Sequence, residues 1–353
     1  MVRKVCIHRG SKEIGVSCVE VVSYCGKRLI LDLGLPLCAD CNDRKYLPDI
    51  PGLDGSDDTL LTILISHPHL DYFGLVGHIY GNIPVIMGKD AGKILIKAAP
   101  FMRGEWNVPT YGLNLTSEKS FELESFRITP YLIDHSAYDA YSIMVEAHGK
   151  HLFYSGDLRI LGRKANLAEN LMNQATEKFD VLLLEDSTLG RLHNQEPFPT
   201  ETEIEQKLAK VFADTTGLTL VHTSAQNIDR VVSIFRACKK TGKTLVIVLY
   251  TAVVLEGTGN KNNHQSDWPE TALYIPEKQR VQIKQNQGLS VMKRHLRNRI
   301  FKSNLQSVSN KSVLLFRPMV LADLDHAGLL GKAVYIYSQW EGYWENKENE
   351  DLR

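Results

Sequence analysis

Residues 66–74 read SHPHLDYFG and place two histidines and an aspartate at alternate positions, directly after the apolar run LLTILI. A hydrolytic zinc ion is held by neutral imidazole nitrogens and carboxylate oxygens, and it keeps one position open for a water molecule whose pKa it lowers. Pro68 restricts the backbone between His67 and His69, so both side chains can turn toward one ion. The segment predicts part of a metal site, and a surface loop rich in histidine is the alternative.

Further candidate ligands follow other apolar runs of the chain. RLILD ends at Asp32, FRITPYLID is followed by His135, HLFYSGD ends at Asp157, and DVLLLE ends at Glu185. An α/β scaffold gathers a site from distant sequence positions at one edge of its sheets, so these strand ends together indicate one shared site. The ligand set contains nitrogen and oxygen but no sulfur, which suits zinc, manganese or iron.

The elements that must position these residues change in character along the chain. The first half is rich in short β-branched or apolar runs bounded by Gly, Asp, Asn or Pro, which predict strands, with helical spacing at 90–102 and 166–175. After Pro197, predicted helices at 200–214 and 228–242 alternate with the strands LTLVHTS and TLVIVLY. This alternation predicts a second α/β unit with a parallel sheet.

Composition bounds the class of protein. The 353 residues are 43% hydrophobic, enough for a substantial core in one large domain or two. Forty-one basic residues balance 41 acidic ones, so the net charge of the protein does not favour binding to nucleic acid or to an anionic membrane. The N-terminus lacks the apolar region of a signal peptide, and no run approaches the roughly 20 apolar residues that cross a bilayer. The sequence therefore predicts a cytoplasmic protein with no membrane partner.

The six cysteines are thinly spread for a chain of this length, which favours reduced thiols over a disulfide framework. Cys38 and Cys41 form one CxxC pair, but no second pair accompanies it. We interpret them as loop thiols, with a structural zinc site as the less favoured alternative.

At these residues the sequence resembles the metallo-β-lactamase fold family, whose signature is HxHxDH followed by a lone His and then a lone Asp. The residues that match this signature are His67, His69, Asp71, His135 and Asp157, and Asp32 matches the family's first motif. GSKEIG near the N-terminus, LLLEDST at a strand end and TSAQNIDR in the second α/β unit also resemble the β-CASP branch. That branch includes the ribonuclease J group, and the resemblance covers nearly the whole chain.

The resemblance implies an α/β fold, the four-layer αββα metallo-β-lactamase sandwich with an inserted β-CASP-like α/β domain. We expect the metallo-β-lactamase domain over residues 1–196 and the β-CASP-like domain over 197–330. Residues 331–353 would then contain a strand that returns to the metallo-β-lactamase core, followed by a charged C-terminal end.

Two positions depart from the family pattern. Tyr72 stands where the family has the histidine that serves its second metal, and a neutral phenol with a pKa near 10 is a poor zinc ligand. The family also supplies a late histidine in a segment like HTSGHA, whereas no histidine follows His326. Residues 334–346 resemble the strand before that segment, so we expect the chain to stop short of it.

The family pattern assigns His67, His69, His135 and Asp157 to the first ion and leaves only Asp71 with the bridging Asp157 for a second. We therefore expect one firm zinc site, with manganese as an alternative metal, and a second site that is weak or absent. Asp71 and Asp157 are the predicted catalytic residues, with Asp71 orienting or deprotonating the attacking water.

Three residues are predicted to support the site. Glu185 would steady the geometry around a ligating histidine, and Tyr72 would line the position of the missing second metal ligand. Asp32 would be a supporting carboxylate, and a turn cap in LDLGLP is an equally good interpretation of it.

The resemblance implies a metal-dependent hydrolase that uses a metal-activated water, most readily on phosphodiesters such as RNA. One alternative is hydrolysis of a small ester or thioester, because the fold hosts many chemistries. The other is a degenerate, non-catalytic member that binds metal or RNA, which Tyr72 and the missing late histidine motivate.

Two segments are candidate substrate contacts. Residues 278–302 carry eight Lys or Arg and no acidic residue, so they predict a phosphate-binding patch, or else a solvated helix face. Ser224 and Asn227 lie where a helix begins, and its exposed N–H groups suit a phosphate, although Ser224 as an ordinary N-cap explains the same pattern. RNA or another phosphodiester is the predicted partner, and a homo-oligomer stays open.

Overall fold

The computed structural model describes residues 2–37, 39, 42–102, 113–174, 179–185, 198–285, 289–345 and 347–352. The chain divides into two compact units, Met1–Phe198 and Pro199–Arg353, whereas the sequence placed this boundary after residue 196. The predicted thiol pair Cys38 and Cys41 lies outside the described residues. Among the residues that are described, no helix is both long enough and apolar enough to cross a bilayer.

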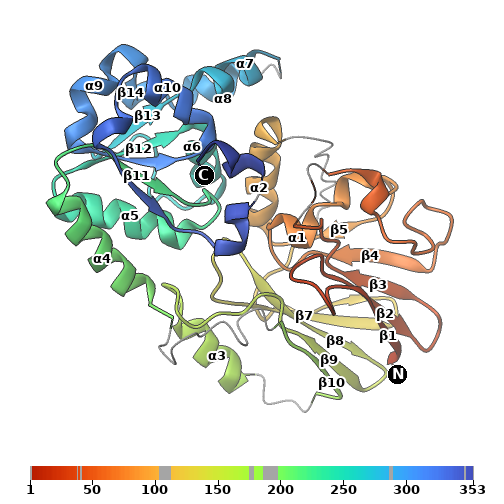
Figure 1. Cartoon of the computed structure of the whole chain (residues 1–353). Helices are drawn as coiled ribbons and strands as arrows, with labels where there is room; N and C mark the ends of the chain where they lie inside the picture. Colours follow the sequence, from red (N-terminus) through yellow and green to blue (C-terminus); the bar gives the residue numbers. More distant parts are fainter. Residues whose placement is uncertain are drawn as a thin grey trace. The chain divides into compact units, whose positions relative to one another are not determined.

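The first unit contains two five-stranded sheets (Figure 1). The first sheet has the spatial order β1 (Val2–Arg9), β2 (Cys18–Ser23), β3 (Arg28–Leu31), β4 (Leu60–Leu64) and β5 (Val85–Ile86). The second has the order β10 (Val181–Leu183), β9 (Lys150–Tyr154), β8 (Tyr141–Ala147), β7 (Phe126–Leu132) and β6 (Phe121–Leu123). The sequence predicted every one of these strands except β6, whose three residues are too short a run to show a pattern.

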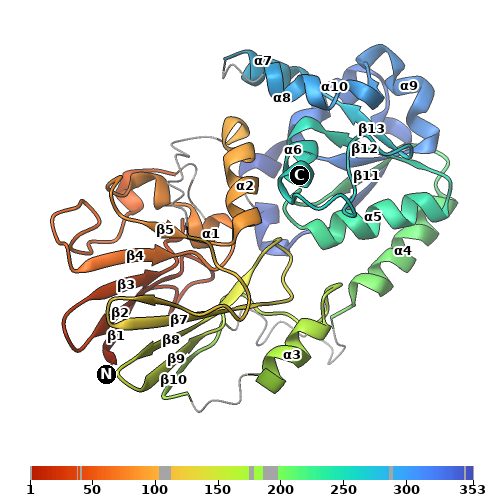
Figure 2. The same ribbon diagram turned by 180° about the vertical axis from the view of Figure 1, so that it is seen from behind.

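The two sheets pack face to face and carry helices on their outer faces, as the opposite views of Figures 1 and 2 show. Leu29 and Leu31 of the first sheet share one buried apolar cluster with Phe126 and Ile143 of the second. A separate cluster joins the outer face of the first sheet to helices α1 (Leu70–Phe73) and α2 (Lys89–Ala98). Another joins the outer face of the second sheet to α3 (Asn166–Gln174). The predicted four-layer αββα sandwich is confirmed.

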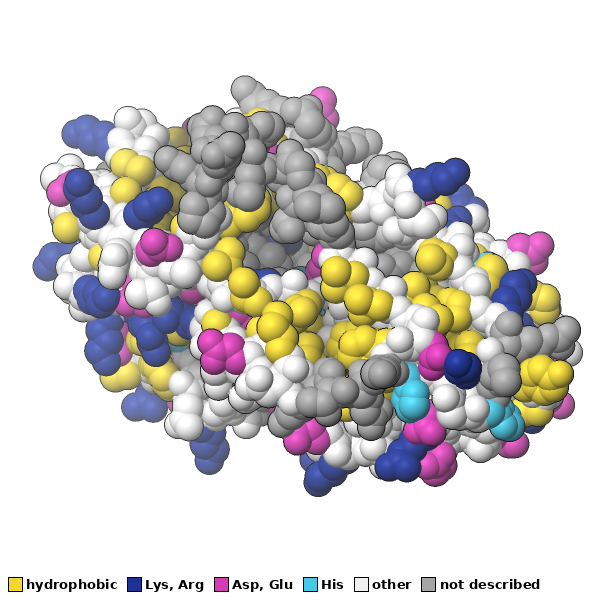
Figure 3. All heavy atoms as spheres, turned by 90° about the horizontal axis from the view of Figure 1, so that it is seen from below, with side chains coloured by type: hydrophobic (Ala, Val, Ile, Leu, Met, Phe, Trp, Pro, Cys, Tyr) yellow, Lys and Arg dark blue, Asp and Glu magenta, His cyan; other side chains and the backbone are white. Residues whose placement is uncertain are grey.

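An apolar strip continues beside α3 on the outer face of the second sheet. Met172 of α3, Leu182 of β10 and Leu184 just after β10 are all exposed. In Figure 3, hydrophobic side chains gather over this part of the surface. Leu182 pairs with Phe153 in the parallel register of β10 and β9, so it lies on the same face as the residues beneath α3.

The second unit contains a six-stranded sheet in which every described strand pair is parallel, as the alternating pattern predicted. Its order is β14 (Arg299–Ile300), β13 (Thr271–Tyr274), β12 (Thr244–Val248), β15 (Ser312–Phe316), β11 (Thr219–His222) and β16 (Val334–Tyr337). Its helices are α4 (Glu201–Asp214), α5 (Ile228–Lys240), α6 (Leu249–Gly257), α7 (Glu277–Gln285), α8 (Leu289–Arg294), α9 (Leu305–Val308) and α10 (Leu321–His326).

The prediction that residues 331–353 return a strand to the first sandwich is wrong for β16. This strand pairs with β11, with Thr219 opposite Val334 and His222 opposite Tyr337, so it extends the sheet of the second unit. The aromatic side chains on β16 explain the pairing physically. Tyr335 packs edge-on against Phe316, and its hydroxyl lies 2.7 Å from His222 Nδ1.

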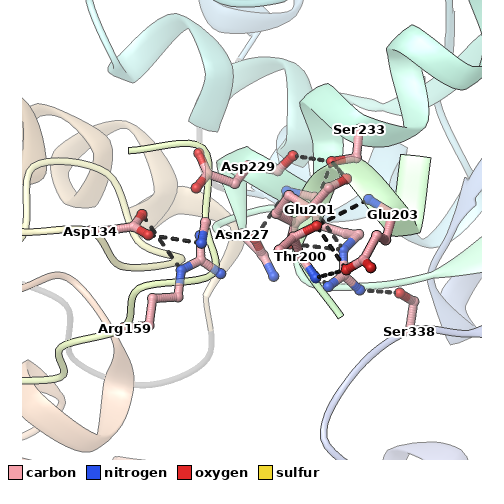
Figure 4. A network of polar contacts seen from close by, with 11 residues as sticks. Asp134, Arg159, Thr200, Glu201, Glu203, Asn227, Asp229, Ser233 and Ser338 are labelled. Carbon is pink, nitrogen blue, oxygen red and sulfur yellow. Dashed lines mark hydrogen bonds and ion pairs between the residues drawn. The ribbon is translucent and has the colours of Figure 1, made fainter. Parts of the chain in front are cut away.

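Helix α4 begins with the capping box that its sequence predicted (Figure 4). The Thr200 hydroxyl accepts a hydrogen bond from the Glu203 backbone N–H at 3.2 Å, and the Glu203 carboxylate accepts one from the Thr200 N–H at 2.7 Å. Two backbone donors at the helix start are thereby satisfied.

A buried ion pair links α4 to α5 (Figure 4). The Glu201 side chain is only 3% exposed, and it accepts hydrogen bonds from Arg230 Nε and Nη2 at 3.0 to 3.1 Å. Ser233 Oγ donates to the same carboxylate at 2.6 Å. Because a buried carboxylate depends on its cation and hydrogen-bond donors, this network fixes the packing of the two helices.

Replacing Arg230 should destabilise the second unit strongly. Arg230→Met leaves the Glu201 carboxylate buried without its guanidinium, so we expect the free energy of unfolding to fall by about 3–5 kcal/mol in urea denaturation. Arg294→Met is the control, because Arg294 is 54% exposed and lies 3.7 Å from Glu256; there we expect a loss of about 1 kcal/mol or less. Equal losses in the two variants would contradict the structural role of the Glu201 pair.

Candidate metal centre

The predicted ligands of the first unit follow strands that end at one edge of the sandwich. β3 and β4 are parallel, with Leu31 opposite Leu64, and Asp32 and His67 come shortly after them. β9 and β10 are also parallel, with Tyr154 opposite Leu183, and Asp157 follows the first of these strands. Parallel strands deliver their carboxyl ends to the same edge of a sheet, which explains how distant residues meet.

The segment between β4 and α1 turns within a few residues. His69 has an extended backbone and is the N-cap residue of α1, and Asp71 lies in the first turn of this short helix. The GSKEIG segment packs onto this turn, because a Cβ atom at Gly15 would lie 2.7 Å from the Asp71 Cβ and Oδ2 atoms. The small residue at position 15 therefore lets the N-terminal loop reach Asp71.

Four side chains form a compact cluster. His67, His69, His135 and Asp157 each present a ligand atom, and these atoms all lie within 4.8 Å of one another. His135 Nε2 lies 3.1 Å from His69 Nδ1 and 3.5 Å from Asp157 Oδ2, and His67 Nε2 lies 3.9 Å from the same carboxylate oxygen. The structure thus brings together the four residues that the sequence assigned to the first ion.

The donors of this cluster fit a divalent cation. Burial lowers the pKa of His67 and of His135 well below the ordinary value and lowers that of His69 to about 4, so all three imidazoles are neutral at pH 7. His67 Nε2 is buried and has no hydrogen-bond partner among the described residues. A buried imidazole nitrogen with a free lone pair that faces a carboxylate is the arrangement expected of a metal ligand.

Carboxyl groups crowd the same site. Burial raises the pKa of Asp157 well above its ordinary range, and the Glu185 carboxyl, with which it shares a hydrogen bond, raises it further. Burial also raises the pKa of Asp71 to about 6, with a smaller contribution from Glu185. Like charges this close together disfavour ionisation unless a cation compensates them.

Glu185 and Asp71, two of the predicted site residues, lie beside the cluster. Glu185 was expected to steady a ligating histidine, but its carboxyl hydrogen-bonds Asp157, while its backbone N–H donates to Ser155 Oγ at 3.0 Å. Asp71 lies beside the cluster but is not one of the four residues whose ligand atoms gather within 4.8 Å.

Asp32 holds the backbone and side chain next to a ligand. It is fully buried with φ at +60°, and its carboxylate accepts hydrogen bonds from the Ser66 N–H at 2.7 Å and the Ser66 Oγ at 2.8 Å. Ser66 Oγ in turn lies 3.0 Å from His67 Nδ1, and Tyr154 donates to Asp32 at 2.7 Å. Asp32 therefore supports the His67 ring through Ser66 and does not act as a simple turn cap.

Tyr72 fills the position where the resembling family has a second-metal histidine. Its side chain is buried, and its ring centroid lies 4.0 Å from that of His67. Burial, followed by the charges of Asp157 and Asp71, raises the pKa of this phenol above its ordinary value. The phenol therefore stays neutral and does not offer the phenolate that a metal would need.

Sequence reasoning missed three residues around the site. Ser66 and Tyr154 connect to Asp32 as described, and Arg159 lies close enough to lower the pKa of His69 and His135. Arg159 Nε lies 3.7 Å from Asp134 Oδ1 (Figure 4). The basic residue two positions after Asp157 was the available signal for Arg159, whereas nothing local in the sequence links Tyr154 to Asp32.

The predicted substrate contacts belong to the second unit. Asn227, and not Ser224, caps α5: its side chain accepts from the Arg230 N–H at 3.1 Å, and Ser224 Oγ accepts from the Gln226 N–H at 3.2 Å. Three basic residues of the segment 278–302 lie near acidic partners, in the pairs Arg280–Glu277, Arg294–Glu256 and Lys302–Asp323. The described part of this segment is therefore partly neutralised.

No family model matches the sequence. Ribonuclease J of Mycobacterium tuberculosis (strain CDC 1551 / Oshkosh) is 24% identical over 249 residues, which cover 68% of this chain and 43% of that protein. Ribonuclease J of Synechocystis sp. (strain ATCC 27184 / PCC 6803 / Kazusa) is 25% identical over 253 residues, which cover 68% of this chain and 38% of that protein. The chain therefore matches less than half of the length of these relatives.

A solved structure shares the fold of the chain. The crystal structure of a protein of unknown function from Enterococcus faecalis V583 superposes with a TM-score of 0.68 at 16% sequence identity, covering 95% of this chain and 88% of that one. In the chain itself, the four-layer sandwich carries its histidine and aspartate cluster at the edge where the strands end. The chain has the metallo-β-lactamase fold and is similar in sequence to ribonuclease J.

Proposed function

We propose that the chain is a metal-dependent hydrolase that cleaves phosphodiester bonds, with RNA as its substrate. The observation that carries this proposal is the cluster of three neutral imidazoles and one carboxylate, whose ligand atoms lie within 4.8 Å of one another. Similarity to proteins named ribonuclease J supports RNA as the substrate class. The second unit, with its parallel six-stranded sheet, would be the β-CASP-like domain.

His67, His69, His135 and Asp157 would hold one zinc ion, with manganese as the alternative. Such an ion supplies a Lewis acid and makes a bound water more acidic. Asp71, with a pKa raised to about 6, is suited to accept a proton from the attacking water near neutral pH. The Arg159 guanidinium, next to Asp134, would face the negative charge of the phosphodiester.

A second candidate function is metal or RNA binding without turnover, which the position of Tyr72 favours. A buried neutral phenol occupies the place of a second-metal ligand, so only one ion would be held firmly. A single ion supports water activation but gives less stabilisation to the leaving oxygen than two ions do.

The first test is cleavage of labelled RNA by purified chain, together with metal analysis. We expect about one tightly held zinc or manganese ion per chain and cleavage that a chelator abolishes. His67→Ala should lose both the ion and the cleavage, because it removes one of three imidazole ligands. Cleavage of equal rate in the variant would identify a contaminating nuclease, and RNA retention without cleavage would favour the binding function.

Tyr72→His should create the missing second-metal ligand. We expect the metal content to rise from about one toward about two ions per chain, because an imidazole replaces a phenol that stays protonated. Tyr72→Phe is the matched control, since it keeps the ring against His67 but adds no ligand. An unchanged metal content in Tyr72→His would show that Tyr72 is not what excludes the second ion.

Asp32→Asn should weaken metal binding without removing a ligand. Asp32 positions His67 through Ser66, and loss of such a partner lowers metal affinity by roughly 10- to 100-fold. Competition with a chromophoric chelator measures this affinity. Asp54→Asn is the control, because Asp54 is exposed and hydrogen-bonds Ser56, far from His67 in the sequence; a similar loss of affinity there would argue against a specific role for Asp32.

A further inference from the structure

A second group of ligand-type side chains lies on the first sheet, at its edge strand β1. Cys6 and His8 come from β1 and Glu20 from β2, and their ligand atoms all lie within 4.8 Å of one another. In β2, Val19 and Val21 point into the cluster between the sheets, so Glu20 points to the outer face. Cys6 lies directly opposite Glu20 in the antiparallel register, which puts both side chains on that face.

A β-bulge in β1 brings His8 into this group. Ile7 pairs with Val19, but the next paired residues are Arg9 and Cys18, so β1 has one extra residue at His8. A bulge of this kind redirects a side chain and is common at sheet edges and beside functional sites. The result is that His8 Nε2 lies 3.1 Å from Glu20 Oε2.

Hydrogen bonds from its neighbours keep the Glu20 carboxyl group ionised, as a metal ligand must be. Arg28 Nη1 donates to Glu20 Oε1 at 2.7 Å, and Arg28 Nη2 donates to Asp57 Oδ2 at 2.8 Å, so two carboxylates face one guanidinium. Burial opposes ionisation of Glu20, but the hydrogen bonds from Arg28 and His8 outweigh it and hold the pKa of Glu20 below its ordinary value. Glu20 is therefore a carboxylate at pH 7, with Oε2 directed toward His8.

The difference in burial between Cys6 and Cys18 determines which of the two thiols can bind a metal ion. The Cys6 side chain is half-buried and remains accessible to an ion, and the His8 side chain is 21% exposed. Cys18 is fully buried, and this burial, followed by the charge of Asp32, raises the pKa of its thiol to about 12. A metal ligand must be a thiolate, so Cys6 is the suitable donor and Cys18 is not.

We propose that Cys6, His8 and Glu20 form a second metal site, selective for zinc or a similar borderline divalent ion. One sulfur, one nitrogen and one oxygen donor make a set that zinc accepts, and three protein ligands leave a fourth position for water or an outside ligand. On binding, the thiol proton leaves to solvent and a metal–sulfur bond forms, with no change of oxidation state. The ion would join edge strand β1 to β2, independently of the cluster around His67.

Cobalt substitution tests this site directly. Cobalt(II) bound by a thiolate gives a sulfur-to-metal charge-transfer absorption in the near ultraviolet, whereas the ligands around His67 contain no sulfur and cannot give it. We expect the full chain to show this band on titration with cobalt and Cys6→Ser to lose it. Cys25→Ser is the matched control, because Cys25 is an exposed thiol in the turn after β2, and it should retain the band.

Two further variants distinguish the site at Cys6 from the cluster around His67. His8→Ala should weaken the band, and His67→Ala should leave it intact, so failure of RNA cleavage and failure of this site are separate results. Far-ultraviolet circular dichroism checks that each variant is folded. Absence of the band at saturating cobalt would overturn the proposal, and so would a band that survives Cys6→Ser and disappears in a Cys38→Ser, Cys41→Ser double variant.

Discussion

The packing of the two sheets of the first unit is the constraint on which the metal cluster depends. Leu29 and Leu31 lie against Phe126 and Ile143 in one buried cluster, and burial of each such side chain contributes roughly 1.5–3 kcal/mol. Because the side chains of a strand alternate between faces, this packing also fixes where each strand ends relative to the others. The ligands after β4, β7 and β9 have their places because the apolar residues before them are held in register.

The same packing creates an electrostatic problem that a cation would relieve. Asp157, Asp71 and Glu185 interact within a partly buried site, and burial with mutual repulsion raises the pKa of both aspartates. The three imidazoles around them are neutral, so they add donors without adding positive charge. Neutral donors and carboxyl groups that repel one another make a site suited to a metal ion, which is the basis of the proposal that the cluster is functional.

The sequence predicted the parts of this arrangement that depend on local pattern. Apolar runs predicted nine of the ten described strands of the first unit, and strand-end positions together with the family pattern indicated the four clustered residues, His67, His69, His135 and Asp157. Contacts that depend on tertiary packing could not be predicted. Tyr154 reaches Asp32 across 122 positions, and β16 joins β11 through aromatic contacts that no short window of sequence reveals.

The two groups of ligands differ in a way that separates their chemistry. In the cluster around His67, two of the four side chains are buried and all donors are nitrogen or oxygen, so an ion there would act as a Lewis acid. The group at Cys6 lies on an edge strand and includes a sulfur donor, so an ion there would form a metal–sulfur bond and affect the stability of the sheet edge. β1 pairs with β2, β2 pairs with β3, and Asp32 directly follows β3. An ion bound at the edge would therefore restrain the strands that hold Asp32 against Ser66.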